Sequence, residues 1–308
     1  MENYENFINE LKKNIFETVG IPMTDMSFAK KGEPGASKGD RLLVTVEKHS
    51  DSAEIFGVHV RELFEECQAG MPMPKVMRQL SAEISAMKSM GIYESSLSMQ
   101  DYEKIKSRLF IRLINADAHS AKLSDSIYKQ VGDIALALYL KIADSNGSIV
   151  STIIRRDVFN HWQLDEDEVF NAALLNTYFI SPPRIFLWEK LIANPEYHGE
   201  NFMDITRPHV LSTNEIGNCL STTVRTNGAV AVFLPGVAER IAELMNSDFY
   251  AVFTSVHEVM IHCADSACVD DLEKVLNDTL RAATPPEDVL THKVYKYCKD
   301  TKKFQMCK

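Results

Sequence analysis

The sequence lacks any hydrophobic run long enough to cross a membrane. Its longest apolar stretches, Ile134–Leu140 and Ala229–Leu234, are far shorter than the roughly 20 residues that a membrane-spanning helix needs. The first residues, MENYENFINELKK, are acidic where an export signal has a basic start followed by an apolar stretch. We therefore expect a cytoplasmic protein that makes no membrane contact.

A disulfide framework is not expected either. The chain holds six cysteines among 308 residues, and cysteines of a protein without an export signal are expected to stay reduced. Apolar residues make up 45% of the chain and charged residues 25%, which is typical of a globular protein with a substantial core. The length suits one large domain or two closely associated lobes.

Positive charge is scarce. There are 33 basic against 43 acidic residues and a formal net charge of -10, which makes nucleic acid an unlikely partner because phosphates attract clustered lysine and arginine. The C-terminal HKVYKYCKDTKKFQMCK is a local exception. Lys302 and Lys303 are candidate contacts for RNA or an acidic partner, although a lysine-protected hairpin at a sheet edge is the favoured explanation.

Several motifs of enzymes are missing. The sequence contains neither a Gly-x-Ser-x-Gly nucleophile motif nor a Gly-x-x-x-x-Gly-Lys-Ser/Thr phosphate loop. The Pro235-Gly236 pair before a helical pattern offers one glycine, which is too little to predict an anion site. No cofactor is expected.

The hydrophobic patterns predict an α+β fold with mixed or antiparallel sheets, helices packed on one face, and successive β-β-α-like blocks. RLLVTVEK alternates as a half-buried strand does, and DIALALYLKIA has a strict period of two followed by the turn DSNGS, which predicts a hairpin. Asp165 and Glu168 have the spacing of a helix cap. NGAVAVF is predicted to be a turn and a strand, and VDDLEKVLNDTL a helix that buries Leu272, Val275, Leu276 and Leu280. We expect an N-terminal α+β lobe at residues 1–95 and a larger one at residues 96–308, unless both form a single domain.

Four segments occur together in a familiar order: RLFIRLINADAH, TNGAVAVFLPGVAERIAE, DFYAVFTSVHEVMI and PPEDVLTHKVYKY. As a set, over about residues 100–300, they resemble an uncharacterised domain-of-unknown-function family of Firmicutes. The resemblance implies a bacterial cytoplasmic protein with no established activity, encoded near mobile-element genes. The segment HCADSAC departs from that pattern, so any chemistry of Cys263 and Cys268 would be particular to this chain.

The segment SVHEVMIHC offers the candidate catalytic residues His257 and Glu258. A zinc protease motif needs two histidines at i and i+4 on one helix, but His257 and His262 are separated by five positions. His257 could instead act as a general base without a metal. Because adjacent residues of an extended chain point apart, a distant carboxylate such as Asp117 would have to orient it. A polar turn that satisfies backbone groups is the favoured alternative.

His262, Cys263 and Cys268 are candidate ligands of a metal site. Cys263 and Cys268 are spaced like some zinc ligand pairs, but no second pair at close spacing completes a set. Buried free cysteines are the favoured explanation, and no metal is expected.

Candidate partner contacts complete the list of functional residues. Met71 and Met73 stand beside prolines and are expected to be exposed, and Trp188 lies in the aromatic-rich segment 181–202. The leading hypothesis is a non-enzymatic interaction or regulatory protein whose partner is another protein. The alternative is a metal-independent hydrolase-type enzyme that uses His257 with a nearby carboxylate.

Overall fold

The computed structural model describes residues 4–33, 36, 39–48, 53–89, 98–145, 148–187, 190, 194, 196–213 and 217–307. The chain divides into two compact units, residues 1–98 with 142–149, and residues 99–141 with 150–308. The boundary expected between residues 95 and 96 lies outside the described residues. All described strand pairs are antiparallel. The predicted α+β class with antiparallel sheets is confirmed.

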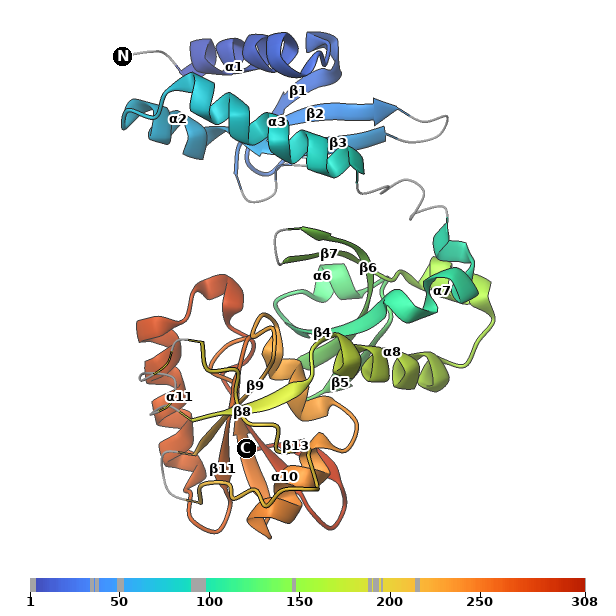
Figure 1. The fold of residues 1–308 in the computed structure, drawn as a ribbon, viewed down its shortest axis with the longest axis vertical. Helices are drawn as coiled ribbons and strands as arrows, with labels where there is room; N and C mark the ends of the chain where they lie inside the picture. Colours follow the sequence, from blue (N-terminus) through green and yellow to red (C-terminus); the bar gives the residue numbers. More distant parts are fainter. Residues whose placement is uncertain are drawn as a thin grey trace. The chain divides into compact units, whose positions relative to one another are not determined.

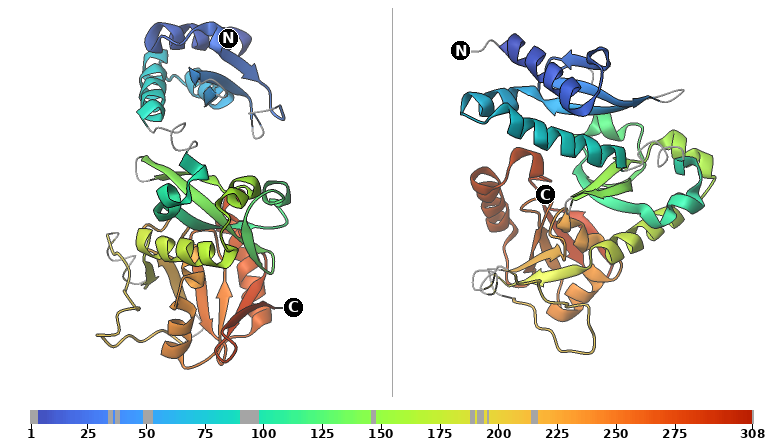
Figure 2. Two further views of the ribbon diagram at one scale, coloured as in Figure 1. Left: turned by 90° about the vertical axis from the view of Figure 1, so that its right-hand side faces the viewer. Right: turned by 45° about the horizontal axis from the view of Figure 1, so that its top comes forward.

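The first unit is a three-stranded sheet, in the order β1-β2-β3, with helices on one face (Figure 2). Its elements are α1 (Tyr4–Val19), η1 (Met23–Asp25), β1 (Met26–Ala29), β2 (Arg41–Lys48), β3 (Ala53–His59), α2 (Val60–Gln68) and α3 (Met73–Ser89). Strand β2 alternates as predicted: Leu42, Val44 and Val46 are buried and join one core with residues of α1 and α3. The buried face of β2 and the apolar stripes of α1 and α3 therefore form one hydrophobic layer.

A four-stranded sheet and its covering helix come next, and all of this sheet except the hairpin end at residues 142–149 belongs to the second unit. The elements of this part are η2 (Ser98–Gln100), α5 (Tyr102–Ile105), η3 (Lys106–Arg108), β4 (Leu109–Asn115), α6 (Ser120–Leu123), β5 (Tyr128–Val131), β6 (Ile134–Ser145), β7 (Ser148–Ile153), α7 (Arg156–Trp162) and α8 (Glu166–Ile180). Strand β6 pairs with β4, β5 and β7. The predicted β6–β7 hairpin is confirmed in its strands, whereas residues 146–147 of its turn lie outside the described residues.

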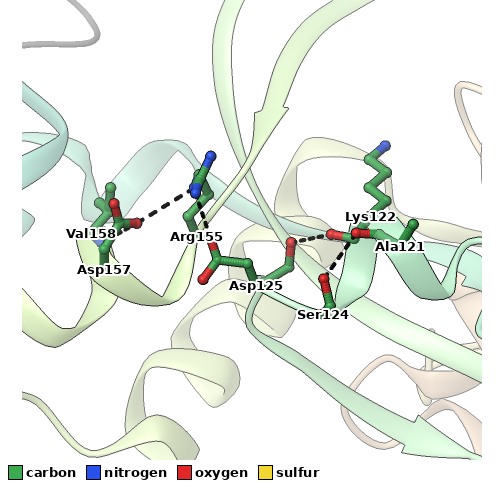
Figure 3. Close-up of polar contacts among 8 residues, drawn as sticks. Ala121, Lys122, Ser124, Asp125, Arg155, Asp157 and Val158 are labelled. Carbon is green, nitrogen blue, oxygen red and sulfur yellow. Dashed lines mark hydrogen bonds and ion pairs between the residues drawn. The ribbon is translucent and has the colours of Figure 1, made fainter. Parts of the chain in front are cut away.

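Caps and surface ion pairs fix the helices of this part. The side chain of Asp165 accepts a hydrogen bond from the backbone N–H of Glu168 at 3.0 Å, as the predicted cap requires. Arg155 immediately precedes α7 and forms ion pairs with Asp125 and, over 3.7 Å, with Asp157 (Figure 3). These exposed pairs position the start of α7 beside the end of α6, but each contributes little stability.

A six-stranded sheet forms the rest of the second unit, in the order β13-β12-β10-β11-β9-β8. Its elements are β8 (Pro183–Phe186), β9 (Asn218–Thr222), η4 (Gly228–Phe233), α10 (Val237–Met245), β10 (Phe249–Val252), β11 (Val259–Cys263), α11 (Val269–Ala283), η5 (Pro286–Asp288), β12 (Val294–Cys298) and β13 (Lys303–Met306). Helix α11 lies along one face of this sheet (Figure 1). Phe233 of η4 stacks on Phe253. Because Phe253 directly follows Val252, which packs against α11, this aromatic pair lies on the face of the sheet opposite to α11.

Two details of the prediction are wrong. Residues 228–233 form the 3-10 helix η4 rather than a strand, and Gly228 to Val232 are buried. A continuous apolar run has no period of its own, so burial is compatible with either backbone. Val275 of α11 is 61% exposed, although Leu272, Leu276 and Leu280 are buried as predicted. Val275 lies beside the stripe that packs on the sheet, so most of its side chain is exposed.

Candidate functional site

The ring of His257 is held in the turn between β10 and β11. Its Nδ1 accepts a hydrogen bond from the backbone N–H of Asn227 at 3.0 Å, and its Nε2 faces Oδ1 of Asp288 at 3.4 Å. The neighbouring Val256 binds the same two segments through its backbone, to Ala229 N–H and to the Asp288 carbonyl. His257 thus fastens η4 and η5 to the sheet.

A glycine makes this close approach feasible. A β-carbon on Gly228 would lie 2.1 Å from Oγ of Ser221 and 2.6 Å from the carbonyl oxygen of His257. The hydroxyl of Ser221 donates to that same carbonyl at 2.7 Å. Asn227, just before the glycine, has a φ of 54°, in the left-handed region that asparagine tolerates. The Asn-Gly pair therefore brings β9, η4 and the His257 turn together.

This geometry limits the chemistry of His257. Because Nδ1 accepts the Asn227 N–H, a neutral ring carries its proton on Nε2, which faces Asp288. A general base needs a free nitrogen lone pair aimed at a substrate, and neither ring nitrogen offers one in this arrangement. The carboxylate beside the ring is that of Asp288, which is distant in sequence as expected, although it is not the example Asp117. The favoured interpretation of the segment, a polar turn that satisfies backbone groups, agrees with these contacts.

Glu258 has different surroundings from its neighbour in the chain. Its Oε1 accepts from the hydroxyl of Thr254 at 3.1 Å, and its Oε2 lies 3.6 Å from the donor sulfur of Cys219. Burial, and then the negative charge of Glu258, raise the pKa of the Cys219 thiol well above its ordinary value. The thiol therefore stays protonated and donates a hydrogen bond to the carboxylate.

Glu258 opens into a groove of about 900 Å³ between the sheet and α11. Strands β10 and β11 form its floor with Val252, Met260 and His262, and α11 forms its wall with Leu272, Val275 and Leu276. The remaining lining residues are Thr254, Ser266, Ala267, Cys268, Asp271, Lys274, Asp278, Thr279 and Ala283. We call this feature the α11 groove. It combines a largely apolar interior with charged residues along the helix.

The metal-ligand candidates separate in the structure. His262 and Cys268 both line the α11 groove, whereas Cys263 follows His262 on β11 and therefore points to the opposite face. In the part of the chain that the structure describes, no three His, Cys, Asp or Glu side chains come together as a metal ion would require. His262 is 7% exposed and packs against Gly217, where a β-carbon would lie 2.7 Å from the ring.

The predicted partner contacts have varied surroundings. Met71 and Met73 are half-buried against the core of the first unit, so little of either side chain is left for a partner. Trp188 lies outside the described residues. Lys302 and Lys303 are exposed at the turn of the β12–β13 hairpin, and β13 ends the six-stranded sheet. This placement agrees with the favoured explanation of a lysine-protected sheet edge.

Sequence reasoning identified part of the groove without recognising it. The alternation of β11 correctly places Glu258, Met260 and His262 on one face. The role of Cys219 was missed because it depends on the pairing of β9 with β11, and that of Thr254 because it depends on the path of the turn between β10 and β11. Asp288 was missed because its approach to His257 depends on the path of η5.

Comparison with known proteins adds the family. No curated protein and no solved structure matches the chain. In addition, no helix among the described residues has the length and apolar character needed to cross a membrane. The sequence model of a family of unknown function (DUF5688) matches residues 4–299. That match covers nearly the whole sequence, so the chain belongs to the DUF5688 family.

Proposed function

We propose that this protein is a non-enzymatic interaction protein of the bacterial cytoplasm, which binds an amphipathic helix of a partner protein in the α11 groove. The observation that carries the proposal is an apolar groove whose wall includes one exposed side chain, that of Val275. Val275 is 61% exposed, and it stands beside Leu272 and Leu276 above a floor that contains Met260. Exposed apolar surface with a charged rim is typical of interaction sites.

The dimensions of the groove suit a helix. The lining residues on α11 run from Asp271 to Ala283, which corresponds to about 18 Å of helix at 1.5 Å per residue. Helix α11 packs on β10 and β12, and the groove beside it is floored by Met260 and His262 of the neighbouring strand β11. A bound helix would contact Val275 and Met260 through side chains at i and i+3 or i+4.

The cellular setting is supported by the thiols. All six cysteines are free, as expected in a reducing compartment. The proposed bacterial origin and the association with mobile-element genes rest on the sequence resemblance. The genes next to the coding sequence would test both.

One observation favours the alternative, a metal-independent hydrolase. His257 has a carboxylate, Asp288, at 3.4 Å from Nε2, which is the kind of pair that orients a catalytic imidazole. However, Nδ1 is engaged by the backbone of Asn227, so the pair leaves no ring nitrogen to activate a nucleophile. This contact weighs against the enzyme, and we place it second.

Site-specific photo-crosslinking in the native cell tests the leading proposal. A crosslinking amino acid at Val275 should capture one partner protein, and the purified partner should then bind the purified full chain saturably. The matched control places the crosslinker at Arg281, which is exposed on α11 but does not line the groove. The same adducts at both positions, or no adduct at Val275, would contradict the proposal. An adduct between two copies of the chain would show that the groove binds a second copy instead of another protein, and would contradict the proposal.

A further inference from the structure

We infer that the partner helix carries a basic side chain, arginine or lysine, that binds the carboxylate of Glu258 inside the α11 groove. This inference rests on the proposed function, and it specifies the chemistry of the partner. It concerns Glu258 together with the apolar residues around it.

The carboxylate of Glu258 is half-buried and has only neutral hydrogen-bond donors. Thr254 donates to one oxygen at 3.1 Å and Cys219 contacts the other at 3.6 Å. Each carboxylate oxygen has two lone pairs, so both atoms retain acceptor capacity toward the groove. Among the described residues, no lysine or arginine forms an ion pair with Glu258. Enclosing such a group under a bound helix is costly unless a cation accompanies the helix.

The charges around the groove also favour a positively charged ligand group. Three carboxylates line it, those of Glu258, Asp271 and Asp278, against one cationic side chain, Lys274. Lys274 stands on α11 between the two aspartates. A cationic ligand group is therefore attracted, and an anionic one is repelled.

In the described part of the chain, Arg225 is the one cation with a charge effect on Cys219, the neighbour of Glu258, and its guanidinium already has other partners. The guanidinium lies 4.8 Å from the ring centroid of Phe186 and donates a hydrogen bond to the carbonyl of Tyr197. These contacts engage the guanidinium of Arg225, which forms no ion pair with Glu258 among the described residues. A bound partner would have to supply the positive charge.

The apolar lining indicates how the basic residue is presented. Met260 lies two residues after Glu258 on β11 and thus on the same face of the strand. The methylene stem of an arginine or lysine can cover Met260 while its charged end reaches Glu258. An apolar residue one helical turn away would contact Val275. The expected motif is therefore one basic and one or two apolar residues on a single helix face.

A display selection with helical peptides tests this motif. The library consists of peptides of about 14 residues, long enough for three turns, with randomised positions on one face, and it is selected on the immobilised full chain. We expect the enriched peptides to share arginine or lysine at one fixed position beside apolar residues. Selection on a Glu258→Gln variant should lose the basic preference while keeping the apolar one, because glutamine preserves the shape but not the charge.

Measurements on a single enriched peptide give the size of the effect. Replacing its arginine by neutral citrulline should weaken binding to the wild-type chain about tenfold, a typical loss for a partly buried charge pair. The same replacement should change binding to Glu258→Gln less than about twofold. Asp270→Asn, which is exposed on α11 and does not line the groove, is the matched control and should change binding less than about threefold.

The outcomes separate the two proposals. Enrichment of apolar helices without a basic residue, or equal losses in wild type and Glu258→Gln, would overturn the inference about Glu258 and leave the groove as a binding site. No enrichment at all, or enrichment that persists on a Val275→Arg variant, would overturn the groove as well. If free arginine amide displaced the peptide at an equal concentration, the groove would be a site for a small cation, and the proposal of a helical ligand would be overturned.

Discussion

The hydroxyl of Tyr295 donates a hydrogen bond to Oδ1 of Asp133 over 2.5 Å, and this contact joins the two sheets of the second unit. Tyr295 belongs to β12 of the six-stranded sheet, and Asp133 stands in the turn between β5 and β6 of the other. Thr291 donates to both oxygens of the same carboxylate. Burial, followed by the bond to Asp133, raises the pKa of Tyr295 well above its ordinary value.

Tyr295→Phe should therefore destabilise the protein by about 1–3 kcal/mol. The change removes a hydroxyl that hydrogen-bonds to the carboxylate and the backbone N–H of Asp133 and to the carbonyl of Val131. Tyr297→Phe is the matched control on the same strand. Its hydroxyl is buried without a hydrogen-bond partner among the described residues, so its removal should cost less than about 0.5 kcal/mol. Urea denaturation of both variants measures the difference. Equal losses would show that the Tyr295 contact does not join the sheets.

Asp248→Asn should destabilise the protein in a pH-dependent way. Hydrogen bonds from the Lys296 side chain and then the Lys299 backbone lower the pKa of Asp248 below its usual 3.8. A carboxyl whose pKa is lower in the folded state contributes stability above its unfolded pKa, and this contribution is lost as pH falls through the folded value. The variant should lose about 1 kcal/mol near pH 7, and the loss should shrink toward zero below about pH 4.

Denaturation curves over this pH range check the dependence. Asp265→Asn serves as the control, since this aspartate is exposed and forms no ion pair among the described residues. A loss for Asp248→Asn that stays constant with pH would indicate a packing effect instead of the ion pair.

Gly228→Ala should be strongly destabilising, by about 3 kcal/mol or more. The added carbon would overlap a side-chain oxygen at 2.1 Å and a backbone oxygen at 2.6 Å, and the backbone oxygen cannot move without the His257 turn. Gly236→Ala is the control. It has a positive φ of 74° but only one neighbour, at 3.8 Å, so it should cost about 1 kcal/mol. Thermal unfolding compares the two, and similar losses would contradict the tight contact.

His257→Ala should reduce stability by about 1 kcal/mol, because the Asn227 N–H loses its acceptor, and it should leave peptide binding in the α11 groove unchanged. His257→Asn places an amide oxygen near the position of Nδ1 and should restore part of the stability. Denaturation and peptide binding by fluorescence anisotropy measure both effects. If His257→Ala removed a hydrolytic activity while stability was unchanged, the enzyme would become the better proposal.

Much of the local structure could be predicted from the sequence. The alternation of Leu42, Val44 and Val46 gave β2 its buried face, and the polar residue Asp165 marked the start of α8. Such patterns succeed because a strand or a helix cap depends on neighbouring residues. The 3-10 helix η4 was missed because its conformation depends on the Asn227 and Gly228 contacts with a distant turn.

Of the α11 groove, only the residues of the floor could be predicted from the sequence. Glu258 and His262 share a face by the period of β11, which the sequence shows. The exposure of Val275 follows from where α11 lies on the sheet, and helical period alone predicted the opposite. Asp288 and Cys219 reach His257 and Glu258 through tertiary structure, for which one sequence offers no periodic pattern.

The strand order of the six-stranded sheet has a consequence for synthesis on the ribosome. Strand β10 lies between β11, which follows it closely in the chain, and β12, which comes only after α11 and η5. Until residues 294–298 have been translated, one edge of β10 has no partner strand. The nascent second unit therefore exposes a sheet edge during translation, a condition that favours aggregation and binding by chaperones. Slowing translation before β12 should lower the yield of folded protein more than slowing it after β13.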